Sequence, residues 1–381
     1  MSELRYSEIR KTLTRPLDFQ EQYGNHAQNL HGFAIQQDEW RGVSIKGWSF
    51  KGVKFESTTW KSDTFENVTF EDCTFHRAIL DKCVFRNCTF RKMGILGGEW
   101  KNSRFEGGAW ENAAWMPSPV SNMGVKIQGL EFSDVKFSEF TPLERSGDWR
   151  ECRFSRCSFA NSDLSKVDFH KPIFSDAMFK DVVWEGFDGR VYEGRCERCS
   201  FENVLQKNGD FDGDVEDIKV EGGNGISVGG KVTRGMFRSS EGAFLMGEAK
   251  DVEIHGGKTS LAVGQATNLK VWEINKGSAS FKGGGKNIEA IGIKVGLLDI
   301  MNGVFENCHF KDVNTKHLDL SGAIFKNCKF ENFHVRERLY INPPPKFENC
   351  EFVNFHRDSI GVGYKFSDDP PESFWLPFER K

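Results

Sequence analysis

The sequence has no long apolar segment and little net charge. No run of apolar residues approaches the roughly 20 that cross a membrane, so we expect no membrane span. The 51 basic and 55 acidic residues nearly balance, which argues against direct binding to nucleic acid or to a charged membrane surface. The opening stretch MSELRYSEIRKTLTRPLDF lacks the apolar core of a secretory signal. We therefore expect synthesis in the cytoplasm, and export by a specialised secretion system stays open.

The sequence also lacks a group of residues with the spacing of a metal or catalytic site. Cys196 and Cys199 have the spacing of zinc ligands, but no second cysteine or histidine pair lies near enough to complete the site. The glycine clusters at 222–225 and 283–285 do not precede a helix or a Lys-Ser/Thr pair, so they indicate turns rather than phosphate loops. We expect no catalytic residue, no metal and no cofactor.

One acidic cluster could form a catalytic or metal-binding site. Asp210, Asp212, Asp214 and Glu216 alternate along a short stretch, as carboxylates can on the wall of a polysaccharide-cleaving β-helix. A solvated turn is the preferred interpretation, and weak Ca²⁺ binding is the lesser one.

Phenylalanine is over-used, at 35 residues against 5 tyrosines, and its positions repeat with a period of five. A large apolar residue occupies every fifth position from Trp40 to Trp115 without a miss. Two positions earlier the residue is usually small, and Asp63 is the polar exception. The slot recurs from Trp149 to Trp184, again from Ile300 to Val335 with a lapse at Thr315, and briefly at Phe347 and Phe352. Such self-similarity is the signature of a repeat architecture.

Nine of the ten cysteines lie two positions before a phenylalanine. A disulfide framework or metal site would not place its sulfurs at a fixed distance from an aromatic residue, whereas a small buried slot would, because a free cysteine packs as a compact apolar side chain. We interpret these as core thiols in reducing surroundings. The predicted core consists of Phe65, Phe70, Phe75, Phe85, Phe90, Cys73, Cys83, Cys88, Phe154, Phe159, Phe325 and Phe330.

With these motifs, such as CVFRN at 83–87 and CSFAN at 157–161, the chain resembles the pentapeptide-repeat family, in the style of its Phe/Cys-rich bacterial members. The resemblance implies an all-β fold, a right-handed β-helix solenoid in which four pentapeptides make one square coil. The sequence tests that coil length independently. If one coil is four pentapeptides long, two residues four pentapeptides apart lie next to each other in neighbouring coils, and their side chains interact. Outward positions at this interval alternate in sign in three rows: Lys46, Glu66, Arg86, Glu106; Lys51, Glu71, Arg91, Glu111; and Lys61, Asp81, Lys101.

The rest of the chain is divided by where the period of five holds. The section from 205 to 298 is rich in glycine and repeats DIKV, DVEI, NLKV and NIEA, beginning at positions 217, 251, 268 and 287. The two short intervals, 17 and 19, fit slightly shorter coils, and the first interval is counted as two coils. We interpret the section as an irregular β-helix, and a separate domain is the alternative. The predicted division is 1–38 an N-terminal cap, 39–115 repeat coils, 116–148 a loop or bulged coils, 149–204 repeat coils, 205–298 the Gly-rich section, 299–362 pentapeptide-like coils, and 363–381 a C-terminal cap or tail.

The tail and the walls suggest what the protein does. Phe374, Trp375, Leu376 and Phe378 either cover the last coil or contact a partner, which could be a second copy of the chain. Within the resembled family, some members are virulence effectors that engage host proteins and others mimic DNA and bind gyrase. The leading hypothesis is a non-enzymatic protein-binding scaffold built on a rigid β-helical rod, with a secreted bacterial effector or a secretion-associated adaptor as its specific form. The alternatives are a DNA-mimicking topoisomerase-binding protein and a carbohydrate-active β-helix enzyme.

Overall fold

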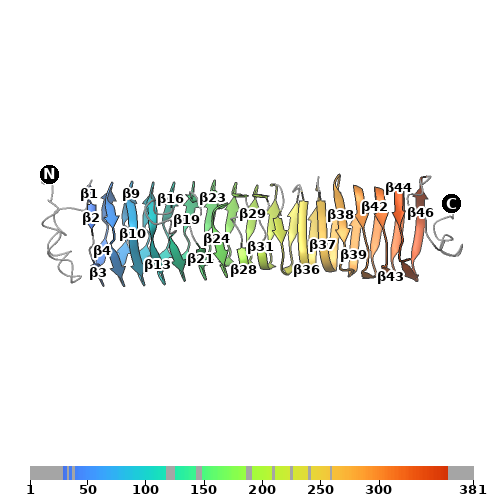
Figure 1. Cartoon of the computed structure of the whole chain (residues 1–381), viewed down its shortest axis with the longest axis horizontal. Coiled ribbons are helices and arrows are strands. Elements are labelled where there is room, and N and C mark those ends of the chain that lie inside the picture. The colour runs from blue at the N-terminus through green and yellow to red at the C-terminus, as the bar shows by residue number, and fades with distance from the viewer. Residues whose placement is uncertain are drawn as a thin grey trace. The chain divides into compact units, whose positions relative to one another are not determined.

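The computed structural model describes residues 29–31, 34–36, 39–116, 125–142, 148–185, 191–207, 211–223, 226–238, 242–257 and 260–358. The chain divides into two units, Met1–Asp212 and Gly213–Lys381. Every regular element in the described ranges is a β-strand, and neighbouring strands pair in parallel from coil to coil (Figure 1). Each unit is therefore a parallel β-solenoid.

Most strands have only three residues, because the other two residues of each pentapeptide form the corner between strands. The first thirty are β1 (Asn29–His31), β2 (Ala34–Gln36), β3 (Glu39–Arg41), β4 (Ser44–Lys46), β5 (Ser49–Lys51), β6 (Lys54–Glu56), β7 (Thr59–Lys61), β8 (Thr64–Glu66), β9 (Thr69–Glu71), β10 (Thr74–Asp81), β11 (Val84–Arg86), β12 (Thr89–Arg91), β13 (Gly94–Lys101), β14 (Arg104–Glu106), β15 (Ala109–Glu111), β16 (Ala114–Met116), β17 (Lys126–Gln128), β18 (Glu131–Ser133), β19 (Lys136–Ser138), β20 (Thr141–Pro142), β21 (Asp148–Arg150), β22 (Arg153–Ser155), β23 (Ser158–Ala160), β24 (Asp168–His170), β25 (Ile173–Ser175), β26 (Met178–Lys180), β27 (Val183–Glu185), β28 (Val191–Glu197), β29 (Ser200–Glu202) and β30 (Leu205–Lys207). The remainder are β31 (Phe211–Glu216), β32 (Lys219–Glu221), β33 (Ile226–Val228), β34 (Val232–Thr233), β35 (Met236–Arg238), β36 (Gly242–His255), β37 (Ser260–Trp272), β38 (Ser278–Phe281), β39 (Gly285–Ile291), β40 (Lys294–Asp299), β41 (Val304–Glu306), β42 (His309–Asp319), β43 (Ile324–Lys326), β44 (Lys329–Tyr340), β45 (Lys346–Glu348) and β46 (Glu351–Arg357).

In unit 1 the central residue of a short strand points into the solenoid and its two neighbours point outward. Phe65 pairs with Phe85 and Phe85 with Phe105, so that the same coil position recurs at an interval of 20. The rings of these residues stack face to face, with centroids 4.8 and 4.7 Å apart. The coil of four pentapeptides, which the charge rows predict, is confirmed for this segment.

Each corner of the coil is made by the residue two positions after the central one. Asn67, Asp72 and Asn87 have φ angles of 53°, 52° and 50°, in the left-handed region that most residues avoid. Asparagine and aspartate tolerate that conformation better than other side-chain-bearing residues. Other corners take the same conformation with serine, arginine or lysine, as at Ser57 and Arg77, so the coil sets the turn and asparagine or aspartate only eases it.

For 116–148, where the sequence leaves a loop or bulged coils open, the structure shows coils over 125–142. Residues 125–142 form a regular coil, with Ile127, Phe132 and Phe137 buried at the central positions. Phe105 pairs with Phe132 rather than with the residue at 125, and Phe132 pairs with Phe154 at an interval of 22. Counting in fives from Trp40 misses this coil because the extra residues shift the phase while the period itself resumes.

The first coil also begins earlier than predicted. Leu30 pairs with Phe50 and Ile35 with Phe55 in the ordinary register, so strands occupy part of the segment 1–38 that was predicted to be a cap. Apolar Leu30 and Ile35 continue the period of five before Trp40. The remaining residues of the predicted cap, and the predicted tail at 363–381, lie outside the described residues.

Unit 2 contains coils of changing length. One column of paired inward residues runs through it and gives the coil lengths directly: Val220, Phe237, Ile254, Val271, Ala290, Phe310, Phe330 and Phe352. Its first three steps are intervals of 17, and Phe237 lies at the end of the first of the two coils expected between DIKV and DVEI. Because Ala290 pairs directly with Phe310, the Gly-rich section of unit 2 and the pentapeptide-like coils form one stack rather than separate domains.

Glycine makes these shorter coils possible by letting backbones approach at one corner. A Cβ at Gly230 would lie 2.2 Å from the carbonyl oxygen of Gly213, and a Cβ at Gly247 would lie 2.2 Å from that of Gly230. The same close approach recurs at Gly264, 2.3 Å from the Gly247 oxygen. No side chain fits in this column, which accounts for much of the glycine content of the section.

We expect Gly247→Ala to lower the free energy of unfolding by roughly 2–3 kcal/mol, because the new methyl group would force two coils apart. The measurement is chemical denaturation followed by circular dichroism. Gly296→Ala is the matched control, since its Cβ would lie 3.3 Å from the nearest atom, the Gly277 oxygen. Equal effects for the two variants would contradict the close-packed glycine column.

Candidate binding site

The outer walls of unit 1 carry rows of ion pairs that run from coil to coil. Lys46 Nζ lies 2.8 Å from Glu66 Oε1, and Arg86 Nε lies 2.9 Å from Glu106 Oε2. On the neighbouring wall, Arg91 Nε lies 2.7 Å from Glu111 Oε2. These pairs occur in two of the three rows predicted from the sequence, and they hold long polar side chains in fixed positions along the wall.

The third predicted row makes different contacts. Lys61 Nζ lies 3.2 Å from Glu39 Oε1, and Lys101 Nζ lies 3.5 Å from Glu99 Oε1. Asp81 accepts a 3.4 Å hydrogen bond from Asn102 Nδ2. Glu39 and Glu99, which precede the central residue of their strands, thus pair with the lysines in place of Asp81. The regular spacing of the row alone does not predict these contacts.

In unit 2 the corners themselves form a hydrogen-bonded ladder. Asn287 Nδ2 donates to Asn268 Oδ1 at 2.8 Å, and Asn268 Nδ2 donates to Asp251 Oδ1 at 2.7 Å. Asn307, Asn327 and Asn349 continue the ladder at 3.4 Å per step. Each amide donates to one coil and accepts from the next, so the corner is specified by the side chain as well as by its backbone conformation.

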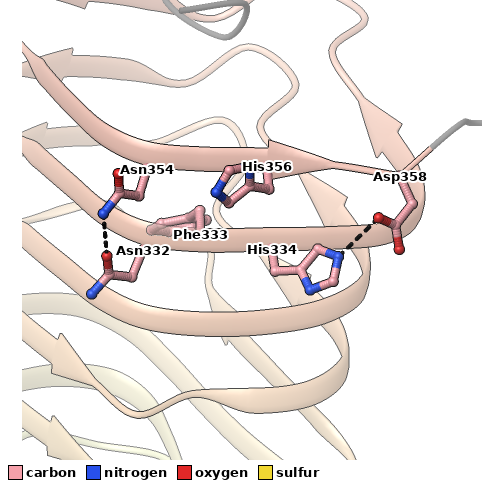
Figure 2. Close-up of a pocket in the computed structure, with 6 residues that line it drawn as sticks. All are labelled: Asn332, Phe333, His334, Asn354, His356 and Asp358. Atoms are coloured by element: carbon pink, nitrogen blue, oxygen red, sulfur yellow. Dashed lines mark hydrogen bonds and ion pairs between the residues drawn. The ribbon is translucent and has the colours of Figure 1, made fainter. Parts of the chain in front are cut away.

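A shallow hollow of about 470 Å³ lies on the wall of β44 and β46. Figure 2 shows its lining: Asn332, Phe333, His334, Asn354, His356 and Asp358. Asn354 Nδ2 donates to Asn332 Oδ1 at 3.0 Å, and His334 Nε2 lies 3.0 Å from Asp358 Oδ1. The buried ring of Phe333 lies between these pairs. The hollow offers amides, imidazoles and one carboxylate for hydrogen bonding to a ligand.

The hollow was not among the predicted sites. His334 and His356 were each visible in the sequence, but no period of five connects them. The signal is the tripeptide NFH, which occurs at 332–334 and again at 354–356. In the structure the two copies pair residue for residue on adjacent strands, so the interval of 22 between them predicts the hollow.

The predicted core residues all lie inside the solenoids, each at most 2% exposed: Phe65, Phe70, Phe75, Phe85, Phe90, Cys73, Cys83, Cys88, Phe154, Phe159, Phe325 and Phe330. Burial raises the pKa of Cys73 to about 11 and that of Cys83 to about 12. Thiols of this kind are inert at neutral pH. The predicted partner contacts Phe374, Trp375, Leu376 and Phe378 lie outside the described residues.

Cys196 and Cys199 lie close together inside the wall of unit 1. Both are buried, and the Cys199 thiol donates to the Phe174 carbonyl oxygen across 3.6 Å. Burial raises the pKa of Cys196, and a hydrogen bond from Cys196 lowers the pKa of Cys199. Within the described ranges, no group of three or more His, Cys, Asp or Glu side chains is placed to hold a metal ion.

The acidic cluster is partly described. Asp214 Oδ1 accepts a 3.1 Å hydrogen bond from the Lys231 amide, and Glu216 pairs with Arg234. These carboxylates therefore link coils of unit 2, while Asp210 lies outside the described residues. The described part of the chain also contains no helix with the length and apolar character of a membrane span.

The geometry thus defines a class, the parallel β-solenoid with outward polar rows. Residues 147–183 match the family model described as pentapeptide repeats, in 8 copies. This segment thus consists of pentapeptide repeats, and the resemblance drawn from the motifs is confirmed. No curated protein matches the sequence.

Several solved structures show weak likeness. QnrB1, a plasmid-mediated fluoroquinolone resistance protein, is 18% identical over 50% of this chain and 91% of its own, with a TM-score of 0.25. HetL, a pentapeptide-repeat protein involved in heterocyst differentiation regulation from the cyanobacterium Nostoc sp. strain PCC 7120, is 8% identical over 82% of this chain and 92% of its own, with a TM-score of 0.21. The mannuronan C-5 epimerase AlgE6 A-module of Azotobacter vinelandii is 9% identical over 88% of this chain and 93% of its own, with a TM-score of 0.24. At these TM-scores the likenesses carry no functional conclusion.

Proposed function

We propose that the chain is a non-enzymatic protein-binding scaffold that works as a secreted effector or a secretion-associated adaptor. The observation that supports this most is the set of inter-coil ion pairs on the walls of unit 1, such as Arg86–Glu106 and Arg91–Glu111. Side chains already held in place lose less conformational entropy when a partner binds. A wall of this kind therefore favours recognition of a complementary protein surface.

The same rows argue against the runner-up, mimicry of DNA. A DNA mimic needs a continuous acidic surface, and here lysine or arginine alternates with the acids along each row. The fields of Glu66 and Glu106 are largely cancelled by Lys46 and Arg86. The overall charge of −4 on 381 residues points the same way.

The cysteines bear on where the chain is made. All ten are free thiols in the structure, which supports synthesis in the reducing cytoplasm. Export by a specialised secretion system would follow synthesis.

The test is capture of partners on the immobilised full-length chain from bacterial and host lysates, identified by mass spectrometry. The double variant Arg86→Glu, Arg91→Glu keeps the core and reverses one of the two cations in each of two rows. We expect a host protein or a secretion component to be retained by the wild type and lost by the variant. Retention of a type II topoisomerase, strengthened by the variant, would instead establish DNA mimicry. An empty column would contradict the scaffold proposal.

A further inference from the structure

Three cysteines of unit 2 occupy the same position in consecutive coils. Cys308, Cys328 and Cys350 each lie two positions before the paired residues Phe310, Phe330 and Phe352. The other seven cysteines, all within unit 1, show no such run; Cys157 and Cys199, for example, have Ala177 between them in the corresponding position. The thiol column of unit 2 therefore stacks cysteines in three consecutive coils, which the described coils of unit 1 do not do.

The middle sulfur lies between a backbone amide and two carbonyl oxygens, those of Phe305 and Lys326, to which its thiol donates across 3.4 and 3.3 Å. The backbone amide of Cys308 donates to Cys328 Sγ across 3.4 Å. Hydrogen bonds from Cys308 and Cys350 lower the pKa of the Cys328 thiol, with Cys308 making the larger contribution. The hydrogen bond to Cys328, together with burial, raises the pKa of Cys308.

The column is open at one end. Cys308 and Cys328 are each 2% exposed, whereas Cys350 is the one cysteine of the ten that is not fully buried. Cys350 is therefore the thiol of the column that a reagent in solvent reaches first.

The spacing of coils favours a bridging metal over a disulfide. Neighbouring strands lie about 4.8 Å apart, and residues stacked in parallel keep their Cβ atoms at nearly that separation. A disulfide needs Cβ atoms roughly 3.5–4.5 Å apart, so it would have to pull the coils together. Two metal–thiolate bonds of roughly 2.3 Å placed end to end span about 4.6 Å, which matches the coil spacing without movement.

We propose that Cys328 and Cys350 bind one soft monovalent d¹⁰ metal ion, of the Cu(I) class, between two thiolates in a linear arrangement. Both thiols lose their protons as the ion enters, so one Cu(I) is exchanged for two protons. Thiolate ligands select Cu(I) over the harder divalent ions. Two ligands suffice for this geometry, and the site needs none of the larger ligand groups that zinc requires.

The experiment is an anaerobic competition for Cu(I) between the full-length protein and the coloured chelator bicinchoninate. The wild type is expected to withdraw one Cu(I) per chain, and Cys328→Ala and Cys350→Ala are expected to lose that competition. Alanine occupies the same small slot at Ala177, so both variants keep a residue that the position accepts. Circular dichroism checks that each variant is folded, and the edge variant Cys350→Ala serves alone if Cys328→Ala does not fold.

The controls are Cys157→Ala and Cys199→Ala in unit 1, which should compete as the wild type does. X-ray absorption of the loaded protein should show two sulfur neighbours around copper. The proposal is overturned if Cys350→Ala withdraws as much Cu(I) as the wild type, if Cys199→Ala abolishes binding, or if the wild type withdraws none.

Discussion

Replacing Asp63 by Asn should stabilise the protein at pH 8 and leave its stability unchanged at pH 4. Asp63 occupies the small inward slot of its pentapeptide and is completely buried. Its Oδ1 accepts a 2.7 Å hydrogen bond from the Val43 amide, while its Oδ2 has no hydrogen-bond partner. The carboxyl group of Asp63 therefore lies in a buried slot where its ionised form is less stable than its neutral form.

The pH dependence follows from the pKa of that carboxyl. Burial raises the pKa of Asp63 from 3.8 to about 7, so the folded state keeps a proton that the unfolded chain releases. Stability from this group is complete below about pH 4, falls as the pH rises from there to about 7, and is flat above that. Asn keeps the neutral form at every pH, and about three pKa units correspond to at most roughly 4 kcal/mol at pH 8.

The measurement is the free energy of unfolding of both proteins at pH 4 and pH 8. Asp72→Asn is the matched control, because Asp72 is an exposed corner residue and should change stability little at either pH. If Asp63→Asn were no more stabilising at pH 8 than at pH 4, the pKa of Asp63 would not be raised in the folded protein and the inward placement of its carboxyl would be wrong.

Replacing Phe85 by Asp should unfold the coils around it. The ring of Phe85 is 1% exposed and stacks between Phe65 and Phe105 at interplanar angles of 6° and 5°. An aspartate there would remove both ring contacts and bury a charge without a partner, for a loss of more than about 4 kcal/mol. We expect a large drop in melting temperature, and loss of amide-exchange protection across the coils from 65 to 105.

Two variants separate this effect from an ordinary substitution. Phe85→Leu places in the slot the residue that Leu80 already provides, and should cost about 1–2 kcal/mol. Arg86→Glu, at the next position, faces solvent and should cost less than about 1 kcal/mol. If Phe85→Asp melted within a degree or two of the wild type, the repeat register would be wrong.

The period of five predicts the fold wherever it is unbroken. Each short strand then has one large apolar residue at its centre, and that residue shows which face of the strand points into the core. At residues 125–142, extra residues change the phase at Phe132, so the sequence alone does not decide between the loop and the bulged coils that it leaves open. In the Gly-rich section the intervals alone gave the coil lengths. The sequence does not show that Gly230 and Gly247 come within van der Waals contact of the preceding coil, because that depends on how two backbones pack.

The surface features were harder to predict. The charge rows are predicted by the sequence, since residues of opposite charge recur in it at equal intervals. The NFH hollow and the thiol column require the coil lengths near the end of unit 2 to be known first, because these change from an interval of 20 to one of 22. His334 meets His356, and Cys328 meets Cys350, only in the longer register.

The alternation of sign along the rows also bears on how the chain avoids misassembly. Its aromatic column is nearly the same in every coil, so a chain that omitted one coil would still place Phe50 against Phe90 or Phe65 against Phe105. The rows would disfavour the omission, because each skipped coil would place Lys46 beside Arg86 and Glu66 beside Glu106, a small cost per pair that adds up over the rows. The aromatic core is nearly the same in consecutive coils, whereas the sign of the surface charge alternates from one coil to the next. The solvent-exposed charges are therefore what disfavours a register in which one coil is skipped.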